Sequence, residues 1–335
     1  MSNNKIILQA ATTIFVALIF VLLFDAQGLN DWATRLEIGK FRSYSLSVTG
    51  PLVKITASLG LDSPKRAVES GFRNAAGIET RAGFLTEKPI VDSVKTEIEI
   101  DSLIQDSEDY TFSDAFKPLR EKNPSSKNKL NLLLLGDSMM GRGLGTVISR
   151  KARRDTLFNV HRVSELSSGL TRSDYFDWFV QADNLLHEKN YDIVALSIGT
   201  NDAQAAEING TKVPFGTELW KKEYSTKVRE FVSIVSNNTD VVYWFGLPPM
   251  RDEGFDRRVK ILNDIFAEVT DEFSNVIYYP LDGIIGDFGF NFTPFKHVRG
   301  KLTRVRLDDG IHFTNEGGAL VAENLIAEIK NQIRQ

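Results

Sequence analysis

The sequence predicts an α/β protein whose carboxy-terminal part is a three-layer α/β/α sandwich on a five-stranded parallel sheet, of the flavodoxin-like kind. Two observations predict this fold. Short apolar runs alternate with longer amphipathic segments along residues 130–335, as in folds that place helices on both faces of a sheet. The apolar runs are continuous, as expected for parallel strands buried on both sides.

Five strands and five helices follow from this pattern. The expected strands are residues 130–135, 158–163, 192–198, 241–245 and 276–279. The expected helices are residues 144–153, 174–187, 219–235, 257–273 and 315–333. Because a helix follows every strand, the strands run parallel and their carboxyl ends meet at one edge, where open α/β sheets hold their ligands.

The amino terminus carries a candidate membrane span. Residues 6–24 are 19 residues without a charge, rich in Ile, Leu, Val and Phe. At about 1.5 Å per residue this segment nearly matches a bilayer core of about 30 Å. Lys5 precedes it and Asp25 follows it, which favours a cytoplasmic tail at residues 1–5. A cleaved signal peptide is the rival interpretation, but residues 24–28 make a poor small-residue cleavage site. We therefore expect a single-pass anchor in the inner membrane.

Two further regions separate this anchor from the α/β domain. Residues 25–73 form a juxtamembrane region whose apolar residues show helical spacing, interrupted at Gly50-Pro51. One or two amphipathic helices are expected there, packed on the main domain, on a partner or on the lipid surface. Residues 74–129 are expected to be an irregular linker that closes with a polar, proline-marked stretch. The catalytic domain is expected over residues 130–335.

Composition excludes several classes of function. A net charge of −4 argues against a nucleic-acid partner, since such proteins present a basic face. The chain has no cysteine, which excludes disulfides, thiolate zinc sites and a cysteine nucleophile. Only four histidines are present, and His161, His187 and His297 are expected to be structural or solvent-facing. No metal or other cofactor is expected.

Four polar motifs follow expected strands. The apolar run 132–135 ends at Gly136-Asp137-Ser138, which would deliver one hydroxyl group to the carboxyl edge of the sheet. Gly169 lies in the segment after the second strand, and Asn201 in the segment after the third. His312 lies beyond the fifth strand, past a long insertion. All four segments reach the same edge if the strands are assigned correctly.

These residues fit the requirements of nucleophilic catalysis. A serine hydroxyl needs an imidazole to take its proton, and the imidazole needs a carboxylate to orient it. His312 and Asp309 supply both from one loop. Asp308 is a rival carboxylate, whereas Asp137 and Asp202 are expected to tie loops together. The backbone N–H groups of Ser138 and Gly169 and the Asn201 amide are candidate donors to an oxyanion.

Four segments of the chain resemble, in order, the four motif blocks of the SGNH (GDSL-like) hydrolases. They are Gly136-Asp137-Ser138, Gly169, Gly199-Thr200-Asn201-Asp202 and Asp309-Gly310-Ile311-His312. The resemblance covers residues 130–333 and implies a Ser138 nucleophile, a His312 base and an Asp309 partner. It also implies an oxyanion hole made by Ser138, Gly169 and Asn201. With the outward-facing anchor, it points to a periplasmic, membrane-anchored branch related to envelope polysaccharide O-acyl esterases and acyltransferases.

Arginines follow several of these motifs. The insertion at residues 291–306 contains Arg299 and Arg304, and Arg142, Arg172 and Arg251 follow strand-end motifs. One interpretation is a solvated basic surface. The other is a lid whose guanidinium groups hold an anionic substrate group.

The sequence therefore predicts a periplasmic serine esterase or O-acyltransferase. Its expected substrate is a small acyl group, acetyl or succinyl, on an envelope carbohydrate such as peptidoglycan, periplasmic glucan or exopolysaccharide. The resemblance also suggests a polytopic, acyl-donating membrane protein as partner. A lipase or lysophospholipase with the same triad and a non-catalytic polysaccharide-binding or assembly protein remain alternatives. A nucleotide-binding protein would need a glycine spacing that residues 141–145 lack.

Overall fold

The computed structural model describes residues 12–13, 25–35, 40–61 and 114–334. The chain divides into two units, Met1–Glu108 and Asp109–Gln335. The predicted cytoplasmic tail lies outside the described residues, as does the predicted anchor apart from Thr12 and Thr13. Within the described ranges, no helix combines the length and the apolar character needed to cross a membrane.

The described part of the first unit is a helical hairpin. Helix α2 spans Ala26–Arg35 and helix α3 spans Lys40–Ser58. The expected one or two helices are thus two, and α3 continues through Gly50-Pro51, where the apolar spacing is interrupted. A proline removes one backbone donor, so it costs the helix the bond to the Ser47 carbonyl but leaves the neighbouring turns intact. The Ser47 hydroxyl donates to the Tyr44 carbonyl at 2.8 Å in the turn before it.

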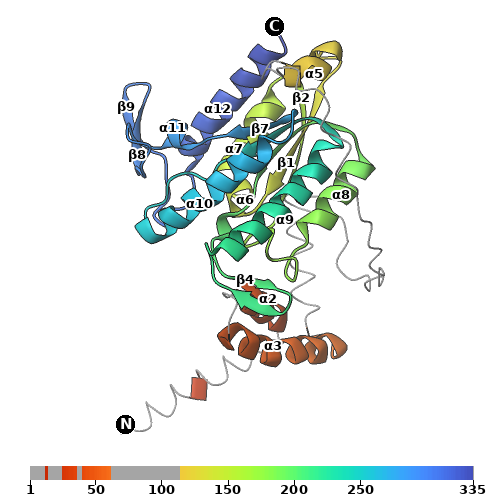
Figure 1. The fold of residues 1–335 in the computed structure, drawn as a ribbon, viewed down its shortest axis with the longest axis vertical. Helices are drawn as coiled ribbons and strands as arrows, with labels where there is room; N and C mark the ends of the chain where they lie inside the picture. The colour runs from red at the N-terminus through yellow and green to blue at the C-terminus, as the bar shows by residue number, and fades with distance from the viewer. Residues whose placement is uncertain (1–11, 14–24, 36–39, 62–113, 335) are drawn as a thin grey trace. The chain divides into compact units, whose positions relative to one another are not determined.

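The second unit is built on a five-stranded parallel sheet (Figure 1). The strand order is β2-β1-β3-β6-β7, and every neighbouring pair is parallel. The strands are β1 Leu130–Gly136, β2 Phe158–Ser164, β3 Tyr191–Ser197, β6 Thr239–Phe245 and β7 Val276–Tyr279. The prediction of a five-stranded parallel sheet is confirmed.

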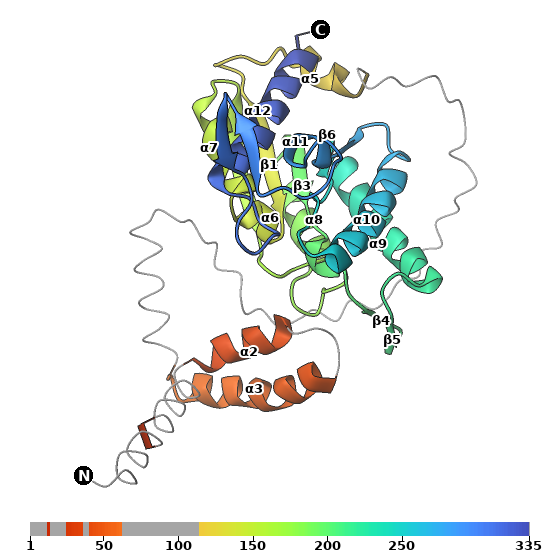
Figure 2. The same ribbon diagram turned by 90° about the vertical axis from the view of Figure 1, so that its left-hand side faces the viewer.

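Helices cover both faces of this sheet, as Figure 2 shows. Helices α7 (Leu144–Arg154) and α12 (Asn315–Gln332) lie on one face. Helices α8 (Trp178–Glu188), α9 (Glu218–Ser236) and α10 (Glu253–Thr270) lie on the other. Neighbouring residues of a strand point to opposite faces of the sheet. Leu132 belongs to the core on the α7 side, and Leu133 to the core on the α9 side. The predicted three-layer architecture is confirmed.

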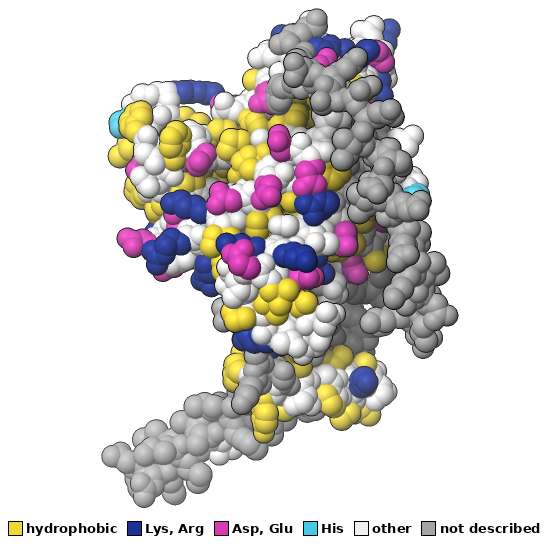
Figure 3. Space-filling model, viewed as in Figure 1, with side chains coloured by type: hydrophobic (Ala, Val, Ile, Leu, Met, Phe, Trp, Pro, Cys, Tyr) yellow, Lys and Arg dark blue, Asp and Glu magenta, His cyan; other side chains and the backbone are white. Residues whose placement is uncertain are grey.

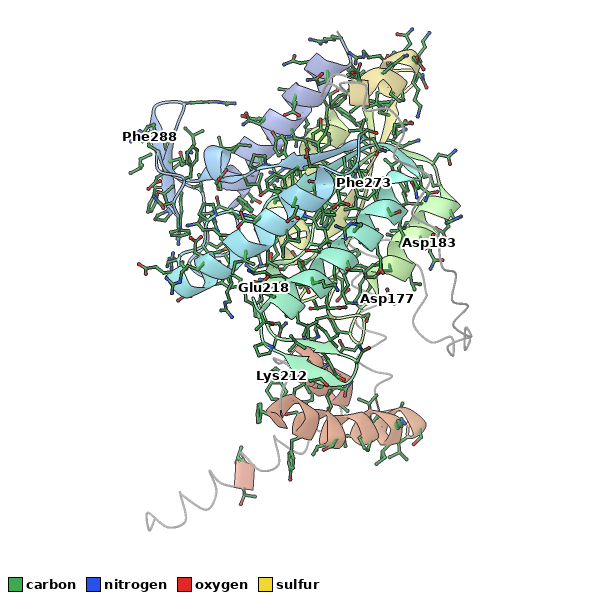
Figure 4. All side chains as sticks on the ribbon, in the orientation of Figure 1. Asp177, Asp183, Lys212, Glu218, Phe273 and Phe288 are labelled. Carbon is green, nitrogen blue, oxygen red and sulfur yellow. The ribbon has the colours of Figure 1, made fainter. Side chains whose placement is uncertain are left out.

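Capping side chains move two helix boundaries away from the predicted ones. The Asp177 carboxylate accepts the Phe179 amide N–H at 3.0 Å, so α8 begins four residues later than predicted. Asp252 accepts the Phe255 amide N–H at 2.7 Å, so α10 begins four residues earlier. Figure 4 shows Asp177 at the start of α8 and Glu218 at the start of α9.

The remaining elements are short. They are η1 Asp114–Phe116, α5 Lys117–Glu121, α6 Ser138–Gly141, η2 Thr200–Asp202, β4 Ala206–Ile208, β5 Thr211–Val213, α11 Asp282–Ile285, β8 Phe295–Val298 and β9 Lys301–Arg304. Residues 114–121 were assigned to the linker, yet Phe116 and Leu119 are buried in the core of this unit. The insertion at residues 291–306 forms an antiparallel hairpin of β8 and β9.

Candidate active site

The turn after β1 sets the position of Ser138. Gly136 allows the chain to pass close to β3, since a Cβ there would lie 2.2 Å from the Ser197 carbonyl oxygen. Asp137 then caps α6 and accepts the Met139 amide N–H at 2.9 Å. The same carboxylate accepts the Thr200 amide N–H at 3.2 Å. Ser138 therefore opens a short helix at the carboxyl edge of the sheet.

A chain of hydrogen bonds joins Ser138 to the far end of the domain. The Ser138 Oγ lies 2.8 Å from His312 Nε2, although the two residues are 174 positions apart. His312 Nδ1 lies 2.7 Å from Asp309 Oδ2. The structure thus brings together the three side chains that the sequence singled out as nucleophile, base and carboxylate.

The Asp309 carboxylate is held ionised. Its Oδ1 accepts the amide N–H groups of Ile311 at 2.8 Å and His312 at 2.9 Å. Partial burial favours the neutral acid, but these two donors and the His312 ring outweigh it and lower the pKa of Asp309 to about 2. An ionised Asp309 keeps a proton on Nδ1, which leaves Nε2 free to accept the proton of Ser138.

Asp308, the rival carboxylate, faces elsewhere. Its side chain is exposed and pairs with Arg304. Its carbonyl oxygen accepts a bond from Arg251 Nη1 at 2.6 Å. Asp309, rather than Asp308, contacts the imidazole.

A second buried carboxylate organises the loop that contains Gly169. Asp202 accepts the amide N–H groups of Leu170 and Thr171, both at 2.9 Å. It also accepts the Tyr224 hydroxyl at 2.9 Å. A Cβ on residue 169 would lie 2.3 Å from Asp202 Oδ1. The Asp202 carboxylate therefore requires a glycine at this position.

The three candidate oxyanion donors lie on loops that these carboxylates connect. Asp137 ties the Ser138 turn to η2, and Asp202 ties η2 to the Gly169 loop. Asn201 uses one amide hydrogen to bind the Ser168 carbonyl at 2.8 Å, which leaves its second hydrogen for a ligand. In the described part of the chain, the backbone N–H groups of Ser138 and Gly169 have no acceptor.

Burial governs the ionisation of both carboxylates. It raises the pKa of Asp137 to about 7, against the opposing effect of the Met139 and Thr200 amides, and the charge of Asp202 adds to the rise. Burial also raises the pKa of Asp202, which the Thr171 hydroxyl and amide oppose. The expectation that Asp137 and Asp202 tie loops together is confirmed by their backbone contacts.

Sequence reasoning did not identify Arg306 as a functional residue. Its side chain is fully buried, and burial lowers its pKa to about 10, so it remains a cation at neutral pH. Its Nη1 donates to the Pro249 carbonyl at 2.7 Å. Its Nη2 donates to the carbonyls of Ile311 at 2.8 Å and Gly310 at 3.3 Å. This residue holds the loop that presents His312.

Aromatic rings enclose the same guanidinium. The rings of Phe292 and Phe313 lie 5.0 and 5.3 Å from it. The only sequence signal for Arg306 was its position six residues before His312, within a cluster of cations that look alike.

The five arginines proposed as an anion-binding set do not form one cluster. Arg172 is only 1% exposed and pairs with Asp174 at 3.2 Å, so it does not line an open surface.

Arg251 and Arg304 both bind Asp308. Arg299 lies at the turn of the β8–β9 hairpin, 3.4 Å from Glu323 of α12. Arg142 is exposed just after α6. The structure thus shows ion pairs for Arg172, Arg299 and Arg304, and the anion-holding lid stays a hypothesis.

Among the residues that the structure describes, no group of His, Asp and Glu side chains is arranged to hold a metal ion. The arrangement of Ser138, His312 and Asp309 requires none, because an imidazole can move the proton of the hydroxyl group.

Several solved structures are similar to this chain. LAE5, an alpha/beta hydrolase enzyme from the metagenome of Lake Arreo, Spain, is 14% identical with a TM-score of 0.44, and the match covers 60% of this chain and 95% of that one. A catalytic mutant of Axe2, an acetylxylan esterase from Geobacillus stearothermophilus, is 14% identical with a TM-score of 0.41 and coverage of 60% and 94%. TesA is 16% identical with a TM-score of 0.41 and coverage of 60% and 99%.

No curated protein matches the chain. A family described as "Protein of unknown function (DUF459)" matches residues 131–328. The chain belongs to this family, and the order of its motif blocks resembles that of the SGNH hydrolases.

Proposed function

We propose that this protein is a serine esterase that works through an acyl-enzyme on Ser138. One observation carries the proposal: the unbroken chain of hydrogen bonds from Ser138 Oγ through His312 to Asp309. A hydroxyl, an imidazole and a carboxylate in this order form the arrangement that activates a serine nucleophile.

Acylation would begin when Ser138 Oγ attacks the ester carbonyl and its proton moves to His312 Nε2. Asp309 stabilises the imidazolium that results. The tetrahedral intermediate then collapses, the bond to the alcohol oxygen breaks, and His312 gives its proton to the departing alcohol. The acyl group remains as an ester on Ser138.

The oxyanion of this intermediate needs donors that are already in place. The backbone N–H groups of Ser138 and Gly169 and the second amide hydrogen of Asn201 supply them in the proposal. Each such donor is typically worth a few kcal/mol in the transition state. Because Asp137 and Asp202 fix the three loops, little reorganisation is needed when the negative charge develops.

The acceptor decides the overall reaction. Water attacking the acyl-enzyme, with His312 as base, gives hydrolysis, whereas a sugar hydroxyl gives transfer. We propose an acetyl or succinyl group on an envelope carbohydrate as substrate. Support comes from residues 6–24, which would anchor the catalytic domain on the periplasmic face, and from the family resemblance. Transfer would need an acyl donor, and a polytopic membrane protein is the proposed source.

A lipase or lysophospholipase is the second candidate, and one observation favours it. Large apolar side chains are exposed just before the His312 loop. They are Phe288, Phe290, Phe295, Leu302 and Leu307. Figure 3 shows hydrophobic side chains around the β8–β9 hairpin, and Figure 4 shows Phe288 pointing away from the domain. Such a surface suits an acyl chain. A series of aryl esters from acetate to palmitate separates the two functions, since the carbohydrate esterase should prefer acetate in kcat/KM.

The proposal is tested by fluorophosphonate labelling and aryl acetate hydrolysis. Wild-type protein should be labelled once, on Ser138. Ser138→Ala should lose labelling and lower kcat by at least about 10⁴-fold. Ser126→Ala, at an exposed serine before β1, is the matched control and should behave as wild type. An unlabelled wild type would instead favour a non-catalytic binding protein. A Ser138→Ala variant that is still labelled would show that the reactive nucleophile is another residue.

A further inference from the structure

Helix α3 carries its large apolar side chains on the outside. Phe41, Tyr44, Val48 and Ile55 are all exposed, Tyr44 at 76%. Their spacings of three, four and seven residues place them on one stripe of the helix. Figure 3 shows hydrophobic side chains along the outside of this hairpin. A stripe of this length on a helix surface marks a site that contacts something other than water.

The opposite pattern holds inside the hairpin. Thr49 and Thr56 are buried, Thr56 at 2% exposure. The Thr49 hydroxyl lies 2.9 Å from Asn30 Oδ1 of α2, so a polar contact joins the two helices. In water, a helical hairpin gains stability by burying its apolar stripe between its helices. This hairpin buries Ala26, Ala33 and the two threonines, and it presents a stripe of larger apolar side chains outward.

Trp32 extends the apolar surface onto α2. Its ring contacts the Phe41 ring edge to face at 6.3 Å, and about half of the Trp32 side chain remains exposed. Together with Tyr44, it provides the two side-chain types that gather where a membrane meets water, since each has an apolar ring and a polar atom.

Position and charge indicate what covers the stripe. Helix α2 begins at Ala26, with only Asp25 between it and the uncharged segment 6–24. Residues 26–58 contain four Lys or Arg and two Asp or Glu, a net charge of +2, whereas the whole chain carries −4. A basic hairpin directly after an apolar segment of membrane-spanning length is suited to an anionic lipid surface.

We propose that the α2–α3 hairpin lies in the lipid–water interface, with Phe41, Tyr44, Val48 and Ile55 turned toward the acyl chains and Trp32 at the headgroup level. The hairpin then acts as a second membrane contact beside residues 6–24. This inference concerns attachment and does not depend on the chemistry of Ser138.

The absence of cysteine from the chain allows a direct test. Single cysteines are introduced into the full chain as Tyr44→Cys, Ile55→Cys and, as matched control, Ala57→Cys. Ala57 is exposed and lies about 200° further around the helix than Ile55. All three positions are exposed, so the substitutions leave the contacts between α2 and α3 in place. Each variant is spin-labelled and reconstituted into vesicles of phosphatidylcholine and phosphatidylglycerol.

Power saturation measures how accessible each label is to two relaxing reagents. Oxygen partitions into lipid, whereas the nickel chelate stays in water. Labels at 44 and 55 should be relaxed more strongly by oxygen than by nickel, and the label at 57 more strongly by nickel. Equal nickel accessibility at all three positions would overturn the proposal. Labels at 44 and 55 that are immobilised and protected from both reagents would overturn it too, because they would show a protein surface over the stripe.

Discussion

The two halves of the candidate active site are held by opposite charges. On the Ser138 side, the buried carboxylates of Asp137 and Asp202 accept backbone N–H groups. On the His312 side, the buried guanidinium of Arg306 donates to backbone carbonyls. The difference follows from what each backbone leaves unpaired. Turns that enter helices present free N–H groups, whereas the irregular loop before α12 presents free carbonyl oxygens.

The comparison teaches that the catalytic geometry depends on residues that do not contact substrate. The two carboxylates fix three loops to one another. On the loop of the base, the buried Arg306 binds two carbonyls and Arg251 binds a third. We therefore expect the His312 side to be more sensitive to a single substitution, and the following experiments test that asymmetry.

The largest effect is expected from the carboxylate that orients the base. Asp309→Asn should lower kcat on an aryl acetate by about 10⁴-fold, because a neutral amide no longer holds the required imidazole tautomer. Asp308→Asn is the matched control one position earlier, and it should change kcat by less than about threefold. A comparable loss in both variants would contradict the assignment of Asp309.

The oxyanion donor on the Ser138 side should have the next largest effect. Asn201→Ala should reduce kcat by about 10²–10³-fold with little change in KM, since the donor acts on charge that exists only in the transition state. Steady-state kinetics on an aryl acetate measures both constants. A rise in KM at constant kcat would instead assign Asn201 to ground-state binding.

Arg306 tests the other half of the comparison. Arg306→Met should lower the free energy of unfolding by about 3 kcal/mol, because three carbonyl groups lose a charged donor in a buried site. It should also lower kcat, since the His312 loop loses its anchor. Arg304→Met, at the half-buried last residue of β9, is the control two positions earlier, with an expected change within about 0.5 kcal/mol. Denaturant titration gives both values, and an unfolding free energy for Arg306→Met equal to that of the wild type would show that the loop is held by other contacts.

The remaining effect is a pH dependence of stability. Burial raises the pKa of Asp137 to about 7 from an ordinary value of 3.8. The folded state therefore binds more protons than the unfolded state between about pH 4 and pH 7, and the free energy of unfolding should fall as the pH rises through this window. Asp309 has the opposite sign, since its lowered pKa of about 2 stabilises the fold above about pH 4 and that contribution is lost in more acidic solution.

Denaturant titrations of wild type and Asp137→Asn from pH 4 to pH 8 isolate the Asp137 contribution. The difference between the two proteins should change with pH up to about 7 and then level off. A difference that is constant across the whole range would show that Asp137 does not change its protonation in the folded state.

The sequence was sufficient for the sheet and for the polar residues at its edge. Continuous apolar runs located all five strands to within two residues, because a strand buried on both faces tolerates few polar side chains. Ser138, Asn201 and His312 could be predicted as site residues because each lies in a segment that follows a predicted strand. The α8 and α10 boundaries were missed because capping by Asp177 and Asp252 fixes the first turn, whereas the apolar spacing does not.

Features that depend on contacts between distant residues could not be read from the sequence. Arg306 has the same sequence signature as the half-buried Arg304, and only the fold buries Arg306 completely. The purpose of Gly169 became clear only when the Asp202 carboxylate was found against it. The break in apolar spacing at Gly50-Pro51 left one or two helices open, and the missing donor of Pro51 did not end α3.

The most direct test of the central claim is to trap the acyl-enzyme. Wild-type protein mixed with an aryl acetate, quenched in acid within milliseconds and digested, should carry one acetyl group on the peptide that contains Ser138. The modified peptide should be absent from Ser138→Ala and should decay in wild type as hydrolysis proceeds. Turnover of the ester without acetylation of that peptide, or with acetylation of a different one, would contradict the account.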